Sequence, residues 1–127
     1  MLDLSYKYMN LQLKNPVIAA SSGQTKTLDN LQKLYDYGVG AVVLKSFFEE
    51  SLPKSPKMNP EENYHPEIYE YFGYEHDKYF GLKDYCNLVS NAKAKFDIPI
   101  IASINCTSAD WWFNFAEQLE ASGADAI

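Results

Sequence analysis

The chain has 127 residues, of which 46% are hydrophobic and 22% charged, and its formal net charge is −6. No stretch approaches the roughly 20 apolar residues that a membrane-spanning helix needs, and the first residues lack the basic and then apolar pattern of a signal peptide. The acidic balance argues against nucleic acid, because its phosphates attract basic patches. We therefore expect a cytoplasmic α/β protein that binds neither membranes nor nucleic acid.

Residues 1–14 predict a small antiparallel hairpin. Apolar and polar residues alternate before and after Met9 and Asn10, and this dipeptide stands where a tight turn would join two strands. Such a hairpin could close the bottom of a barrel.

Residues 15–46 predict a strand, a helix and a second strand. Two short apolar runs, at residues 15–20 and 41–44, are typical of buried strands in a parallel sheet. Between them, apolar residues recur at helical spacing, and Thr27 or Asp29 can cap the helix.

Residues 47–83 form an acidic, tyrosine-rich insertion. Its part from residue 49 to 77 contains eight acids and two lysines, so it carries the whole net charge of the chain. Four prolines exclude a continuous helix or central strand through its first half. Three interpretations stay open: a solvated loop that packs on the scaffold, a substrate lid, or a contact between subunits.

Residues 84–127 predict a helix, a strand, a second helix and the start of a fourth strand. The first helix is expected at about residues 82–96 and the strand at residues 98–104. Ser108 or Asp110 can cap the second helix. Residues 111–113 are Trp-Trp-Phe, which we expect to pack inward with one ring exposed.

The strand–helix–strand pattern occurs twice along the chain. Residues 16–20 recur as residues 99–103, and Gly38 recurs as Gly123 at a nearly equal offset. Both glycines are placed to end a helix. A repeated strand–helix–strand unit predicts a parallel sheet with helices outside it.

Polar residues follow each predicted strand, where parallel α/β folds gather their chemistry. Ser21 and Ser22 follow the first strand, Lys45 and Ser46 the second, and Asn105 the third. For Lys45 the alternative is a charge that leaves the core into solvent, and for Asn105 it is a strand-end amide with ordinary backbone partners.

Other residue types point to no site. The two histidines are eleven positions apart, which is not a metal-ligand spacing, so we expect no metal. Cys86 and Cys106 lack the close spacing of a redox or zinc pair and are expected to be reduced thiols. All basic residues are lysines, which excludes a bidentate guanidinium clamp from this chain.

Six segments in the same order resemble dihydroorotate dehydrogenase-like flavoproteins, and the likeness is greatest to the cytosolic class 1 type. They are Asp3-Leu4-Ser5, residues 11–16, Ala20-Ser21-Ser22, residues 43–46 with 48–50, residues 101–105 and residues 119–127.

The resemblance implies an FMN-dependent (β/α)8 TIM barrel that oxidises dihydroorotate to orotate in pyrimidine biosynthesis. It places Ala20, Ser21 and Ser22 along the flavin through their backbone, and Asn105 at the flavin edge. Lys45 and Ser46 would lie beside flavin and substrate, where the lysine charge would favour anionic reduced flavin and bind a substrate carboxylate. The partners implied are a small-molecule substrate and further copies of the full-length chain in a homo-oligomer.

Two features depart from that family. The asparagine-containing loop that grips orotate has no counterpart in residues 71–85, so the substrate is expected to be dihydroorotate or a related compound. A complete barrel needs about 250 residues, so we expect the N-terminal portion of one, inactive alone, with the general base beyond Ile127. The alternatives are a non-flavin TIM-barrel enzyme acting on a phosphorylated metabolite, and a non-catalytic homologue that binds a partner through residues 47–83.

Overall fold

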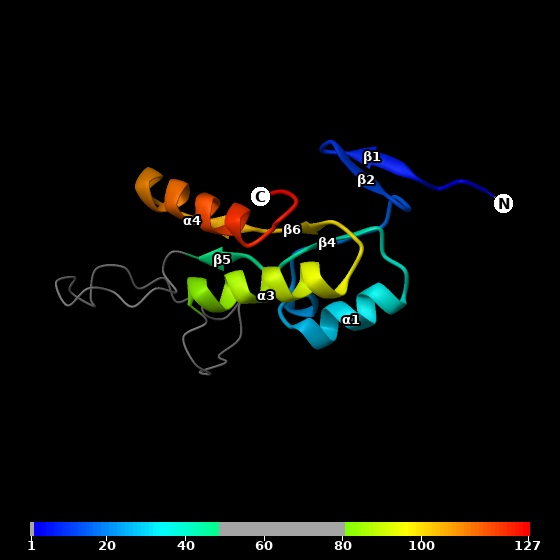
Figure 1. Ribbon diagram of the computed structural model, residues 1–127, viewed down its shortest axis with the longest axis horizontal. Helices are drawn as coiled ribbons and strands as arrows, with labels where there is room; N and C mark the ends of the chain where they lie inside the picture. Colours follow the sequence, from blue (N-terminus) through cyan, green and yellow to red (C-terminus); the bar gives the residue numbers. More distant parts are fainter. Residues whose placement is uncertain (1, 49–80) are drawn as a thin grey trace, which may run out of the picture.

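A computed structural model describes residues 2–48 and 81–127, and its centre is a parallel sheet (Figure 1). The sheet contains β3 (Ile18–Ala19), β4 (Ala41–Val43) and β6 (Ile100–Ile101), hydrogen-bonded in that order. Ala126 adds a parallel bridge beside Ile101, at the free side of β6. The strands therefore lie side by side in the order in which the chain makes them.

Three helices of the described residues accompany this sheet. They are α1 (Leu28–Asp36), α3 (Leu82–Lys95) and α4 (Ala109–Ala121), and α3 contacts both of the others. Figure 1 shows α1 and α3 side by side along the strands. The combination of parallel strands and helices confirms the mixed α/β class.

The predicted caps of two helices are present. Thr27 Oγ1 accepts a hydrogen bond from the N–H of Asn30 at the start of α1, and Ser108 Oγ accepts one from Trp111 at the start of α4. Gly38 and Gly123 follow the two helices with φ of 85° and 96°, a backbone region that favours glycine. The repeated glycine thus has the same role in both halves.

The two repeats also share a backbone contact where each helix leads into its strand. The N–H of Gly40 donates to the carbonyl of Val17 at 2.7 Å, and the N–H of Asp125 donates to the carbonyl of Ile100 at 2.9 Å. The repeat in the sequence is therefore a repeat in the hydrogen-bond pattern.

One hydrophobic core joins the sheet to the helices, and it drives the association of these short elements because apolar surface leaves water there. Its most deeply buried side chains come from α1, α3, α4 and the strands: Leu31, Val42, Leu44, Val89, Ala92, Ile100, Phe115 and Leu119. In α1 and α3 the apolar residues at helical spacing face this core, and in α4 Phe115 and Leu119 do so.

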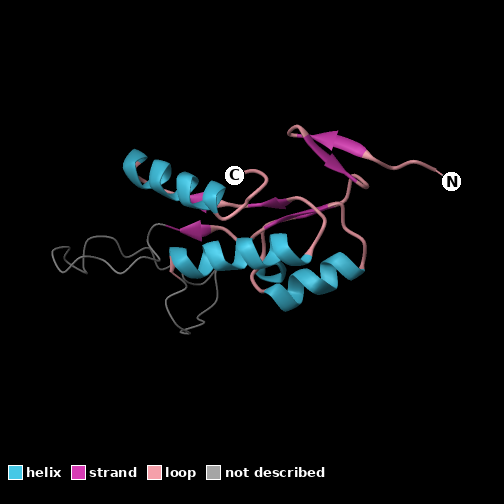
Figure 2. Ribbon diagram, in the orientation of Figure 1, coloured by secondary structure: helices cyan, strands magenta, loops and turns pink. Residues whose placement is uncertain are grey.

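The N-terminal hairpin has the predicted antiparallel form. It consists of β1 (Tyr6–Tyr8) and β2 (Leu11–Leu13), and Met9 and Asn10 connect them with φ of 47° and 63°. Two successive positive φ values are typical of the tight turn that matches the twist of a hairpin. Figure 2 shows this pair projecting away from the parallel strands.

The strands differ from the prediction in length and burial. The strand expected at residues 15–20 contains only Ile18–Ala19, and both residues are half-buried because β3 lies at the edge of the described sheet. The strand expected at residues 98–104 is divided into β6 and β7 (Ile104–Asn105). β6 pairs with β4, whereas β7 pairs with β5 (Phe47–Phe48).

The insertion expected at residues 47–83 therefore differs at both ends. Phe47 belongs to β5 and is buried in the core, and α3 begins at Leu82. Residues 49–80, with the tyrosine-rich stretch and both histidines, lie outside the described residues.

The aromatic residues that open α4 are more exposed than predicted. Trp111, Trp112 and Phe113 expose 45%, 47% and 68% of their surface, because Phe115 and Leu119 occupy the buried face of the helix. Among residues 2–48 and 81–127, no helix combines the length and the apolar character needed to cross a bilayer.

Candidate functional site

Three serine hydroxyl groups form a row across the carboxyl ends of β3, β4 and β6. Ser21 Oγ lies 3.3 Å from Ser46 Oγ, and Ser46 Oγ lies 2.6 Å from Ser103 Oγ. Ser21 Oγ also accepts a hydrogen bond from the backbone N–H of Ser46 at 3.0 Å. We call Ser21, Ser46 and Ser103 the serine row. Each serine stands two or three residues after the end of its strand, so the parallel sheet itself brings the three together.

Ser103 is held where the backbone changes partners between β6 and β7. Its carbonyl accepts hydrogen bonds from the N–H of Phe47 at 2.8 Å and from the hydroxyl of Tyr85 at 3.2 Å. Its own N–H donates to the Tyr85 hydroxyl at 3.0 Å. The phenol oxygen thus serves the strand as a hydrogen-bonding partner at the point where the ladder shifts.

Tyr85 reaches this point from α3 through the core. Its side chain is 2% exposed, and burial raises its pKa to about 12. The ring lies 5.6 Å from the ring of Phe47, which in turn makes an edge contact with Phe115. An aromatic cluster therefore supports the carboxyl edge from below, and the hydroxyl stays protonated at neutral pH.

A short helical turn, η1 (Gly23–Thr25), follows the first strand and shapes the end of the row. Ser22 caps it, since its Oγ accepts from the N–H of Gln24 and its N–H donates to Thr25 Oγ1. Thr25 is buried, and its carbonyl accepts a bond from the N–H of Lys45 at 3.3 Å. The Ser22 hydroxyl is thus engaged in the local turn, whereas that of Ser21 points to its neighbour strand.

The other expected site residues lie at the same edge with different surroundings. Ala20 is exposed directly after β3, and Lys45 is half-buried two residues after the end of β4. Asn105 is exposed on β7 opposite Phe48, two residues beyond Ser103. The described hydrogen bonds bring Ser21 and Ser46 together; they do not place Asn105 in the row.

The row can present a hydrogen-bond donor to a ligand. Each hydroxyl has one proton to donate and can accept two bonds. The two contacts between hydroxyl groups use two of the three protons, so one O–H of the row remains for an acceptor outside it. A carbonyl or a carboxylate oxygen is the natural acceptor for it.

Sequence reasoning missed Ser103 and Tyr85 as members of this edge. A signal for Ser103 existed, because the repeat aligns it with Ala20 at the end of a strand. Tyr85 lies on the buried face of α3. Nothing in the spacing indicated that its hydroxyl meets a strand 18 residues away.

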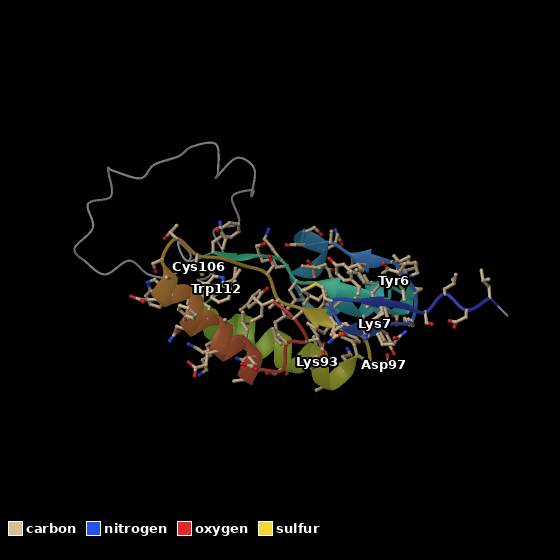
Figure 3. All side chains as sticks on the ribbon, turned by 90° about the horizontal axis from the view of Figure 1, so that it is seen from above. Tyr6, Lys7, Lys93, Asp97, Cys106 and Trp112 are labelled. Atoms are coloured by element: carbon tan, nitrogen blue, oxygen red, sulfur yellow. The ribbon has the colours of Figure 1, made fainter. Side chains whose placement is uncertain are left out.

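Both cysteines are free thiols, as expected. Cys86 lies on α3, where burial raises its pKa, and Cys106 follows β7. Figure 3 shows Cys106 and Trp112 where the chain passes into α4, far from Tyr6 and Lys7 of the hairpin. Within the described ranges, no three His, Cys, Asp or Glu side chains gather in a way that could hold a metal ion.

No protein-family model matches the chain. No curated protein matches it either.

Proposed function

We propose that the chain forms the N-terminal portion of a (β/α)8 barrel that binds FMN and oxidises dihydroorotate or a related small molecule. The observation that carries the proposal is the serine row at the carboxyl edge of strands whose spatial order follows the chain order. A doubly wound sheet reverses its strand order at a switch point, whereas a barrel adds each strand beside the previous one. The order β3, β4, β6 and then Ala126 supports the barrel.

The residues present at this edge fit a flat, acceptor-rich ring system. Ala20, Ser21 and Ser22 are small and exposed, so a ligand can approach their backbone closely. The remaining O–H of the serine row suits a ring carbonyl. FMN, when bound, supplies the acceptor of the hydride that leaves the substrate.

Lys45 supplies the positive charge at this edge. Its side chain is half-buried next to Ser46, where water screens charges less than in bulk solvent. We propose that its ammonium group binds a substrate carboxylate and stabilises negative charge that develops on the ring system. We propose that a general base, as in the family that the sequence resembles, takes the proton that leaves the substrate.

The first test is the colour of the purified full-length protein. FMN should co-purify through gel filtration and be released on denaturation. Anaerobic addition of dihydroorotate should bleach the bound flavin. A protein that binds no FMN under any loading condition contradicts the proposal, and retention of a phosphorylated metabolite would favour a non-flavin barrel enzyme.

The second test isolates Lys45. The variant K45Q should reduce the rate of flavin bleaching by about 100-fold, the usual effect of removing one group that stabilises developing charge. K33Q makes the same charge change on an exposed part of α1 and should leave the rate unchanged. Equal rates for K45Q and the wild-type protein would exclude Lys45 from substrate binding.

A further inference from the structure

We propose that Tyr85 is the positioning residue of the flavin edge: its hydroxyl fixes Ser103 and, through it, the end of the serine row that meets the ligand. This inference rests on the proposed function, because the ligand whose carbonyl the serine row would meet is the proposed flavin.

One phenol oxygen makes both contacts to the Ser103 backbone. It accepts the N–H at 3.0 Å and donates its own proton to the carbonyl at 3.2 Å. The N–H of Phe47 holds the same carbonyl at 2.8 Å. The peptide groups on both sides of Ser103 are thus fixed by partners from α3 and β5. The direction of its Cα–Cβ bond follows from that backbone, so the position of Oγ is restricted as well.

The short contact to the next serine depends on this restriction. Ser103 Oγ lies 2.6 Å from Ser46 Oγ, and Ser46 in turn contacts Ser21. If Ser103 moves, the row breaks at its shortest contact. The fixed geometry of the serine row therefore requires the Tyr85 hydroxyl. Tyr85 itself is buried beneath the site and does not reach the ligand.

Packing alone does not account for a tyrosine at this position. The ring contact with Phe47 and the burial of the ring would both be kept by phenylalanine. The hydroxyl adds two bonds to a strand segment that ends at the candidate site. Such support beneath a site preorganises the groups that touch the ligand.

The test compares two Tyr-to-Phe variants of the full-length protein loaded with FMN. Y85F removes the hydroxyl beneath Ser103. Y35F removes a hydroxyl that donates to Asp97 Oδ1 at 2.8 Å on the exposed surface, so it is the matched control. The measurements are the dissociation constant for FMN, the visible spectrum of the bound flavin and its midpoint potential. A role confined to folding would change only the melting temperature.

We expect Y85F to weaken FMN binding by roughly tenfold, as the loss of ordered hydrogen bonds to the ligand implies, and to shift both the flavin spectrum and the potential. Y35F should leave all three at wild-type values. In the double variant Y85F with S103A, the loss should equal that of S103A alone, because Tyr85 acts on the ligand only through the Ser103 hydroxyl. The inference is overturned if the losses of FMN affinity of the two single variants add in the double variant. It is also overturned if Y85F has wild-type affinity and spectrum.

S103A keeps the test decisive if Y85F does not fold. It retains the backbone clamp and removes only the hydroxyl, so it should reproduce the weaker binding and the shifted spectrum; wild-type behaviour of S103A overturns the inference. A wild-type protein that binds no FMN overturns the proposed function and this inference with it. FMN binding that Y85F leaves unchanged overturns the inference alone.

Discussion

Ser46 and Ser103 share a hydroxyl–hydroxyl hydrogen bond of 2.6 Å between the ends of two neighbouring parallel strands. Ser46 stands in the middle of the serine row, since it also contacts Ser21 through both its hydroxyl and its backbone N–H. Two strands that are 57 residues apart in the chain thus meet through side chains at the edge where the proposed ligand binds.

S46A should disconnect the row and weaken FMN binding. Each lost hydrogen bond is worth about 0.5–1.5 kcal/mol, and the variant loses both contacts between hydroxyl groups, so we expect roughly a tenfold increase in the dissociation constant. Fluorescence titration of the full-length protein measures it. S90A is the control, because Ser90 Oγ donates to the Ser122 carbonyl on the outside of the molecule. Equal affinities for S46A and S90A would show that the row does not contact the flavin.

The regular elements could be predicted from the sequence because local rules decide them. Thr27 and Ser108 cap their helices, and Gly38 and Gly123 end them, since capping and positive φ depend on one or two residues. The row was predicted in part: the ends of β3 and β4 were identified, and Ser103 was not. Its role depends on which strands become neighbours.

Long-range contacts explain the remaining differences. The run at residues 98–104 has continuous β character, yet it is divided because β4 and β5 occupy different stretches of its edge. Phe47 was assigned to the insertion by its neighbours in the chain, whereas its burial depends on Tyr85 and Phe115, which are distant in sequence. The residues next to Phe47 in the chain do not indicate that it packs against these two distant rings.

The repeated glycines should respond alike to substitution. G38A and G123A each place a side chain at positive φ, which costs about 1–2 kcal/mol and should lower the free energy of unfolding by that amount. G23A is the control, because a Cβ there meets no atom within 4 Å. G40A should destabilise most, since its Cβ would overlap the carbonyl oxygen of Asn15. Urea unfolding measures all four, and a G40A variant as stable as G23A would contradict the packing described.

Asp125 should matter more than its ion-pair partner. Its carboxylate accepts from Lys93 Nζ at 2.8 Å and from the buried backbone N–H of Ile100 at 2.7 Å. K93A removes a partly exposed ion pair, worth about 0–1 kcal/mol. D125A also leaves the Ile100 N–H without this acceptor, which costs a further penalty of about 1–3 kcal/mol. Urea unfolding of the two variants should rank D125A well below K93A, and equal losses would mean that the carboxylate acts only through the ion pair.

Tyr85 should make stability fall in alkaline solution. Burial raises its pKa from 10.0 to about 12 in the folded protein, so between these values the unfolded chain loses the phenol proton while the folded chain keeps it. The contribution is fully present below pH 10 and disappears as the pH rises toward 12. The slope from this one group is about 1.4 kcal/mol per pH unit. The difference between wild-type and Y85F unfolding free energies, measured from neutral to alkaline pH, isolates it from the other tyrosines. Y85F should lose less stability than the wild-type protein above pH 10, and parallel curves would show that the Tyr85 hydroxyl is exposed to solvent.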